Sequence, residues 1–136
     1  MSDGEEHRGG CLCGDIRYAI GTPVSPGALC HCVSCRRASG APAVAWVTVR
    51  EVAFRLEKGT PEEYRSSPQV RRGFCRRCGT PLTYRHEGHP GFVDVTVASL
   101  DEPAALAPAD HVWTEDRIAW MEHLDDLPEY PRTRVS

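Results

Sequence analysis

The sequence predicts a mainly β protein, a small antiparallel β-sandwich with few short helical turns. Short runs rich in β-branched and aromatic residues recur at intervals of roughly ten residues. Glycine and proline separate these runs, as is typical of chains that turn back after each strand. We expect strands at residues 15–20, 44–49, 53–56, 63–65, 70–74, 82–84 and 92–98.

Few segments favour helix. Residues 34–39 and 104–106 are each expected to form one helical turn, whereas residues 118–123 are compatible with a helical turn or a strand. The chain has 136 residues, which is the size of one ordinary domain. We therefore interpret residues 1–8, which are polar and acidic, as a flexible leader and residues 9–136 as a single domain.

Composition narrows the range of partners. The formal charge of −3 argues against nucleic acid as a partner, and no apolar run reaches the roughly 20 residues that span a membrane. The beginning of the chain does not resemble a secretion signal, so we expect a cytoplasmic protein. Fifteen of the sixteen basic residues are arginine, which suits bidentate binding of carboxylates. A codon bias toward Arg, Ala, Gly and Pro is the alternative explanation of this excess. The oligomeric state is left open.

Seven cysteines occur in three clusters, and an odd number argues against a disulfide framework. In the third cluster, two residues separate Cys75 from Cys78 and Gly79 follows. This spacing lets a tight turn direct both sulfurs at one zinc ion. A redox pair is less consistent with the sequence, because Thr80 and Pro81 follow rather than a helix.

The first cluster, Cys11 and Cys13, supplies the two further ligands that a closed site requires. We expect these residues in a strand, where residues i and i+2 point to the same face. Zinc bound by Cys11, Cys13, Cys75 and Cys78 would have four sulfur ligands, an arrangement typical of structural sites.

The second cluster, Cys30, Cys32 and Cys35, forms a compact set of three thiols. Three protein ligands and one open position are typical of a catalytic zinc, and a small thiol is a suitable fourth ligand. His31 is an alternative fourth ligand. The site would also be closed if one of the other histidines supplied the fourth ligand, and these candidates are His86, His89, His111 and His123.

Pairs of arginines flank the clusters: Arg36–Arg37, Arg71–Arg72 and Arg76–Arg77. A pair that faced the open zinc position would favour a thiol that also carries carboxylates, and glutathione has one thiol and two carboxylates. Our candidates for substrate binding are Arg36, Arg37 and His31. The sequence identifies no clear general acid or base, although His31 and His111 are candidates.

These motifs, in this order, resemble the glutathione-dependent formaldehyde-activating enzyme (GFA) family, which includes centromere protein V-like proteins. The resemblance covers nearly the whole chain, and all seven cysteines match. It rests on GGCLCG at residues 9–14 with IRY at 16–18, CHCVSCR at 30–36 with Gly40, FCRRCGTPL at 74–82, HVW at 111–113, Trp120 and LPEY at 127–130.

The resemblance implies packed, tent-like β-sheets held by two zinc ions per chain. Cys11, Cys13, Cys75 and Cys78 would bind the structural ion, and Cys30, Cys32 and Cys35 the catalytic ion. The implied activity is that of a carbon–sulfur lyase, which joins glutathione and formaldehyde to give S-hydroxymethylglutathione.

Two other functions stay open. One is a non-catalytic module, stabilised by zinc, that binds glutathione, a peptide or a protein partner. The other is thiol redox chemistry, which would require a cysteine free of metal.

Overall fold

The computed structural model describes residues 5–134, which form ten β-strands, one α-helix and five 3₁₀ helices. The strands are β1 (Glu6–Gly10), β2 (Arg17–Gly21), β3 (Gly27–Cys30), β4 (Val44–Arg50), β5 (Phe54–Lys58), β6 (Glu62–Ser67), β7 (Val70–Phe74), β8 (Pro81–His86), β9 (Phe92–Thr96) and β10 (Pro108–Val112). The helices are α1 (Val33–Ser39), η1 (Glu51–Ala53), η2 (Val97–Ser99), η3 (Pro103–Leu106), η4 (Thr114–Asp116) and η5 (Ala119–Asp126).

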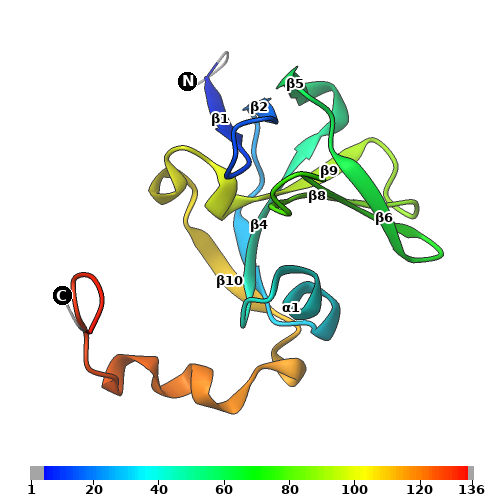
Figure 1. The fold of residues 1–136 in the computed structure, drawn as a ribbon. Helices are drawn as coiled ribbons and strands as arrows, with labels where there is room; N and C mark the ends of the chain where they lie inside the picture. Colours follow the sequence, from blue (N-terminus) through cyan, green and yellow to red (C-terminus); the bar gives the residue numbers. More distant parts are fainter. Residues whose placement is uncertain (1–4, 135–136) are drawn as a thin grey trace.

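Two sheets enclose the core (Figure 1). The smaller has the order β1-β2-β5, and the larger has the order β10-β3-β4-β9-β8-β7-β6. Tyr18 and Ile20 of the small sheet pack against apolar residues of the large sheet such as Val47 and Val95, all at most 1% exposed. The mainly β fold with two sheets and few helices is therefore confirmed.

The central strands of the large sheet have two different faces. On β4, Val47 and Val49 enter the core, while Trp46 and Thr48 alternate with them on the opposite face. Asp94 of β9 lies directly across from Thr48. Through this alternation the sheet supplies both the core and one wall of the candidate site.

The predicted strands are present, with shifts of at most two residues at their ends. Residues 97–98, expected at the end of a strand, belong instead to η2, and residues 118–123 are helical rather than extended, since they fall largely in η5. Three strands were not predicted from the sequence: β1, β3 and β10. The pair β10–β3 is parallel, which departs from the expected antiparallel pattern.

Strand β1 begins within the segment 1–8 that the sequence analysis assigns to a flexible leader. Its residues Glu6, His7 and Arg8 pair with β2, and Arg8 forms an ion pair with Glu57 on β5. Residues 1–4 of the expected leader lie outside the described part of the chain. The domain boundary itself stays a prediction.

After β10 the chain leaves the two sheets. Figure 1 shows residues beyond η4 running away from the sheets as an extended arm, on the side opposite β6. We refer to residues 117–134 as the C-terminal arm. Among residues 5–134, no helix is long and apolar enough to cross a membrane.

Candidate functional site

The structure brings the first and third cysteine clusters together. The sulfurs of Cys11, Cys13, Cys75 and Cys78 all lie within 4.8 Å of one another. Cys13 Sγ lies 3.7 Å from Cys11 Sγ and 3.8 Å from Cys75 Sγ, although Cys13 and Cys75 are 62 residues apart in sequence. We refer to these four residues as the four-cysteine cluster.

The two halves of this cluster have nearly the same backbone. Cys11 N donates to Ile16 O, and Cys75 N donates to Thr80 O, at 3.1 and 3.0 Å. The glycine in each turn, Gly14 or Gly79, has a φ of 84° and donates its N–H to the carbonyl of the first cysteine. Cys11 and Cys13 therefore meet through a turn, and the strand expected for this pair is wrong.

The four-cysteine cluster fits a zinc ion. Tetrahedral zinc with Zn–S distances of about 2.3 Å places its sulfurs about 3.8 Å apart, which agrees with the two distances above. Ile16 N donates to Cys11 Sγ, and hydrogen bonds from Thr80 lower the pKa of Cys78 to about 5. Both contacts favour thiolates, the form in which cysteine binds metal.

The second cluster is built from one short stretch of chain. Cys30 ends strand β3, Cys32 is the N-cap of α1, and Cys35 lies in the first turn of that helix. Cys35 N donates to Cys32 Sγ at 3.2 Å, so the helix begins on a sulfur. The three sulfurs lie within 4.8 Å of one another, which suits one metal ion. We refer to these residues as the three-cysteine cluster.

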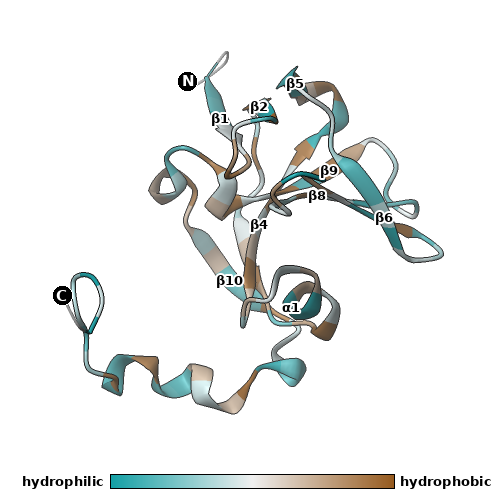
Figure 2. Ribbon diagram, in the orientation of Figure 1, coloured by the Kyte–Doolittle hydropathy of each residue, from teal (hydrophilic) through white to brown (hydrophobic). Residues whose placement is uncertain are grey.

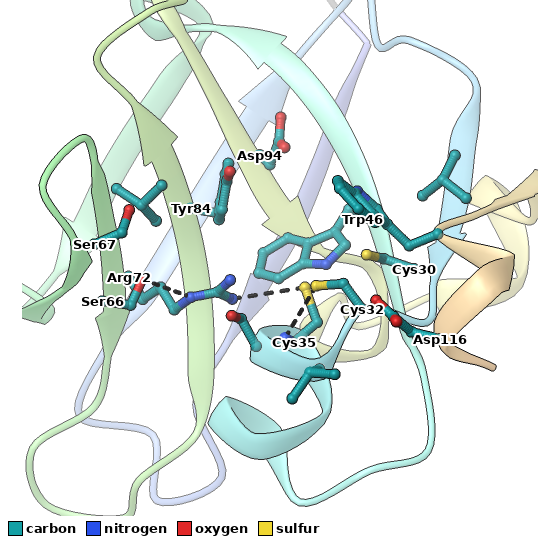
Figure 3. Close-up of a pocket in the computed structure, with 15 residues that line it drawn as sticks. Cys30, Cys32, Cys35, Trp46, Ser66, Ser67, Arg72, Tyr84, Asp94 and Asp116 are labelled. Carbon is teal, nitrogen blue, oxygen red and sulfur yellow. Dashed lines mark hydrogen bonds between the residues drawn. The ribbon is translucent and has the colours of Figure 1, made fainter. Parts of the chain in front are cut away.

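All three cysteines of the three-cysteine cluster line a cavity of about 450 Å³ (Figure 3), whereas Cys75 alone of the four-cysteine cluster lines a separate hollow. Trp46 and Val112 also lie in the wall of the 450 Å³ cavity. The other side chains in the wall are largely polar, and they come from β6, β7, β8, β9 and η4: Ser66, Arg72, Tyr84, Asp94 and Asp116.

Arg72 is the cation that reaches the sulfurs. Its Nη1 lies 3.7 Å from Cys35 Sγ, and its Nε donates to Ser66 Oγ at 3.1 Å. The guanidinium also lies over the ring of Tyr84, 5.1 Å from the ring centre. Because these contacts fix the side chain, its positive charge is held beside the cluster.

The thiols of the three-cysteine cluster differ in pKa. Hydrogen bonding with Cys30, supported by Cys32 and Arg72, lowers the pKa of Cys35 to about 5. The same interaction with Cys35 raises the pKa of Cys30. Cys35 is therefore the first of these two thiols to lose its proton, which prepares the cluster for a metal cation.

The cavity wall has two carboxyl groups that were not predicted from the sequence, Asp94 and Asp116, and Asp94 is the more distinctive. Its Oδ1 accepts a hydrogen bond from Thr48 Oγ1 at 2.6 Å. Burial raises its pKa, so the neutral acid persists to higher pH than for an exposed aspartate. An aspartate among the apolar residues of 92–96 was the available signal, because burying a carboxylate is costly.

His31 lies behind the three-cysteine cluster and is not among the residues that line the cavity. Its side chain is fully buried, and its Nε2 lies 2.9 Å from Nδ1 of His111 on β10. Burial, followed by Arg117 and His111, lowers its pKa. The structure therefore places His31 and His111 beside the metal-binding segment rather than where a substrate would sit.

The predicted substrate arginines occupy a different place. Arg36 and Arg37 lie on α1, and neither lines the cavity, whereas Arg72 from another of the three pairs does. Of the other histidines proposed to close the site, none groups with the three cysteines among residues 5–134. His86 and His89 line a separate hollow of about 270 Å³ on the far side of Tyr84 and Asp94.

Comparisons with known proteins agree with this arrangement. The family described as glutathione-dependent formaldehyde-activating enzyme matches residues 6–116. A protein of Schizosaccharomyces pombe named an uncharacterized lyase is 30% identical over 91 residues, which cover 65% of this chain and 66% of that protein. A crystal structure of a Rhodobacter sphaeroides protein has the same fold, with a TM-score of 0.63 and 24% identity over 77% of this chain and 99% of the other.

Proposed function

The chain belongs to the glutathione-dependent formaldehyde-activating enzyme family, and we propose that it makes or breaks a carbon–sulfur bond between a small thiol and a carbonyl carbon. One observation carries the proposal: the three-cysteine cluster opens into a cavity, with Arg72 Nη1 3.7 Å from Cys35 Sγ. A thiol and a small carbonyl compound can both reach the sulfurs there.

In this proposal the chain holds two zinc ions with different roles. Cys11, Cys13, Cys75 and Cys78 hold a structural ion, and Cys30, Cys32 and Cys35 hold the other. Zinc bound by three thiolates supplies a Lewis acid with one open position, which lowers the pKa of a thiol bound there.

In this proposal the residues of the cavity stabilise the charge that develops during the reaction and transfer the proton. In the direction of synthesis the thiol loses its proton, its sulfur bonds to the carbonyl carbon, and the carbonyl oxygen gains a proton. Arg72 stabilises the negative charge that develops during these steps. Asp94, whose pKa burial raises, is the group of the cavity suited to carry the proton.

We further propose glutathione as the thiol and formaldehyde as the carbonyl compound, with S-hydroxymethylglutathione as the product. The family name supports this choice. Arg72 supports it too, because the guanidinium in the cavity wall matches the carboxylates of glutathione.

The test measures zinc per chain and turnover together. Protein purified under reducing conditions is titrated with a chelator, with and without glutathione, and consumption of formaldehyde is followed. We expect two zinc ions, one of which exchanges readily and responds to glutathione, and formaldehyde consumption that requires this ion.

Two inert zinc ions and no turnover would contradict the proposal and favour the non-catalytic binding module. A disulfide formed with peroxide while both ions are retained would favour redox chemistry instead.

A further inference from the structure

The C-terminal arm exposes more apolar surface than a solvated segment needs. From residue 119 to residue 134 every residue except Met121 is exposed. The large apolar side chains among them are about half exposed: Trp120 at 54%, Leu124 at 41%, Leu127 at 58% and Tyr130 at 54%. Figure 2 shows brown apolar positions recurring along this arm, away from both sheets. Exposed apolar clusters of this kind mark sites of protein–protein contact.

Among the residues that the structure describes, no hydrogen bond or ion pair joins the arm beyond Ile118 to its own sheets. The hydrogen bonds and ion pair within the described part of the arm join near neighbours, for example Met121 N to Ile118 O and His123 to Asp126. The arm contains two short 3₁₀ turns within η5, which meet at a kink at His123 (φ −126°, ψ 24°). A segment that exposes large apolar side chains and has no partner in its own chain indicates that its partner lies on another chain.

The large sheet carries a groove that matches the arm in chemistry. This groove, of about 300 Å³, lies beside the three-cysteine cavity and is lined mainly by apolar side chains: Val44, Trp46, Tyr64, Phe74 and Pro81. Tyr64 is 65% exposed at its edge. We refer to it as the β6–β8 groove. In Figure 1 the arm extends away from β6, so the arm of the same chain does not cover it.

The charges of the β6–β8 groove and of the arm are also complementary. Seven arginines form ion pairs with carboxylates within the described chain: Arg8, Arg17, Arg55, Arg65, Arg71, Arg77 and Arg85. The other eight arginines form none among the described residues. Of these, Arg72 lines the β6–β8 groove, and Arg36 and Arg37 lie on α1, whose Cys35, Ala38 and Ser39 also line it. The remaining five, Arg50, Arg76, Arg117, Arg132 and Arg134, do not line the groove. Arg36 Nε is buried on α1 with no hydrogen-bond partner among the described residues. Buried donors of this kind normally have a partner, so an acceptor is expected beside α1.

The arm supplies the opposite charges. Between residues 119 and 130 it has no lysine or arginine and carries four carboxylates, Glu122, Asp125, Asp126 and Glu129, interspersed with the apolar side chains. An apolar, acidic segment and an apolar groove beside arginines that have no carboxylate partner among the described residues therefore occur in one chain that does not bring them together. We propose that the arm docks in the β6–β8 groove of a second copy of this chain, in a reciprocal dimer.

Docking of the arm from the second copy would also affect the candidate site. The groove shares Cys35, Trp46 and Arg72 with the three-cysteine cavity. The arm of the second copy would thus form one side of the site and cover residues that are otherwise open. The proposal itself rests on the arm and the groove, so it can be tested whether or not the proposed reaction is correct.

The first experiment measures the mass of the full chain in solution by sedimentation over a range of concentrations. We expect about 30 kDa, twice the chain mass of 15.0 kDa. Trp120→Ala or Leu127→Ala should weaken the dimer by about tenfold or more, because buried aromatic and apolar anchors dominate such interfaces. The control is Val52→Ala, since Val52 is 88% exposed on η1, outside both surfaces, and this change should leave the mass unaltered.

A second experiment identifies the partner surface by charge reversal. One chain carries Glu122→Lys, Asp126→Lys and Glu129→Lys, and the other carries Arg36→Glu and Arg37→Glu. Each alone should be monomeric with an unchanged circular dichroism spectrum, and the mixture should form a heterodimer, because both arm–groove pairs are then complementary.

Three results would overturn the proposal. The first is a monomer at every concentration, and the second is a dimer that Trp120→Ala and Leu127→Ala leave intact. The third is a mixture of the charge-reversed chains that stays monomeric although both chains are folded.

Discussion

The two cysteine clusters use the same ligand type in opposite ways. The four-cysteine cluster joins Cys11 and Cys13 to a turn more than sixty residues later, so it fastens distant parts of the fold. The three-cysteine cluster lies within six consecutive residues, so a metal ion bound there would link no distant segments of the chain. It opens instead into a cavity whose wall includes Arg72 and Asp94. The difference supports the proposal that one cluster serves stability and the other chemistry, and the predictions below test that proposal.

The largest expected effect is on folding. Cys75→Ser should unfold the protein, since a structural zinc site contributes about 10–16 kcal/mol and a domain has only about 5–15 kcal/mol of net stability. Circular dichroism and zinc per chain measure this outcome. Leu12→Ser is the matched control, because Leu12 lies between two ligands but is 88% exposed. A folded Cys75→Ser protein with normal zinc content would contradict the structural role.

Cys35→Ser should separate activity from folding. We expect turnover to fall to background and one zinc ion per chain to be lost, while the melting temperature changes little, because the three-cysteine cluster joins no distant segments. Ser34→Ala is the control, since Ser34 lines the same cavity without offering a sulfur. Full activity in the Cys35→Ser protein would show that the cluster takes no part in the reaction.

A smaller effect on activity is expected at Arg72. Arg72→Gln removes the guanidinium beside Cys35 Sγ and should lower kcat/KM roughly 10- to 100-fold, the usual effect of losing a partner of a metal ligand. Zinc per chain should be retained at saturating metal. Arg71→Gln is the control, because Arg71 instead pairs with Glu63. Equal effects of the two substitutions would indicate a general loss of positive charge.

The smallest effect concerns pH and Asp94. Burial raises the pKa of Asp94 above its ordinary value of 3.8, so the folded protein binds more protons than the unfolded chain between these two pKa values. The stability of the wild type should therefore fall as pH rises through this window. Asp94→Asn should remove that loss and leave the protein at least as stable near pH 7, while lowering turnover. Urea unfolding at several pH values measures it, and parallel pH curves for the two proteins would contradict the assignment.

Sequence reasoning reached the grouping of the cysteines but not their surroundings. Two residues between Cys75 and Cys78 let both sulfurs reach one ion, so the spacing predicts a pair of ligands. The spacing of Cys11 and Cys13 fits either a strand or a turn, and the structure has the turn. Either backbone conformation would bring the sulfurs of Cys11 and Cys13 to those of Cys75 and Cys78.

The arginines show why the cavity was harder to predict. Arg71 and Arg72 are adjacent on β7 and so point to opposite faces of the sheet, and only the pairing with β8 determines that Arg72 faces the cavity. Strands β3 and β10 were missed because their sequences, GALC and PADHV, include residues that rarely favour strands. Pairing with neighbouring strands offsets that weak local preference.

The long sequence separation between Cys13 and Cys75 has a consequence for the nascent chain. The ribosome releases Cys11, Cys13, Cys30, Cys32 and Cys35 well before Cys75 and Cys78. During that interval five thiols compete for any zinc, and four of them from the first two clusters can bind one ion in a set that the finished protein never uses. Correct folding then requires exchange of that ion once Cys75 and Cys78 emerge. Under the proposed zinc assignment, zinc supply during translation, and not only after folding, should affect how much correctly folded protein is made.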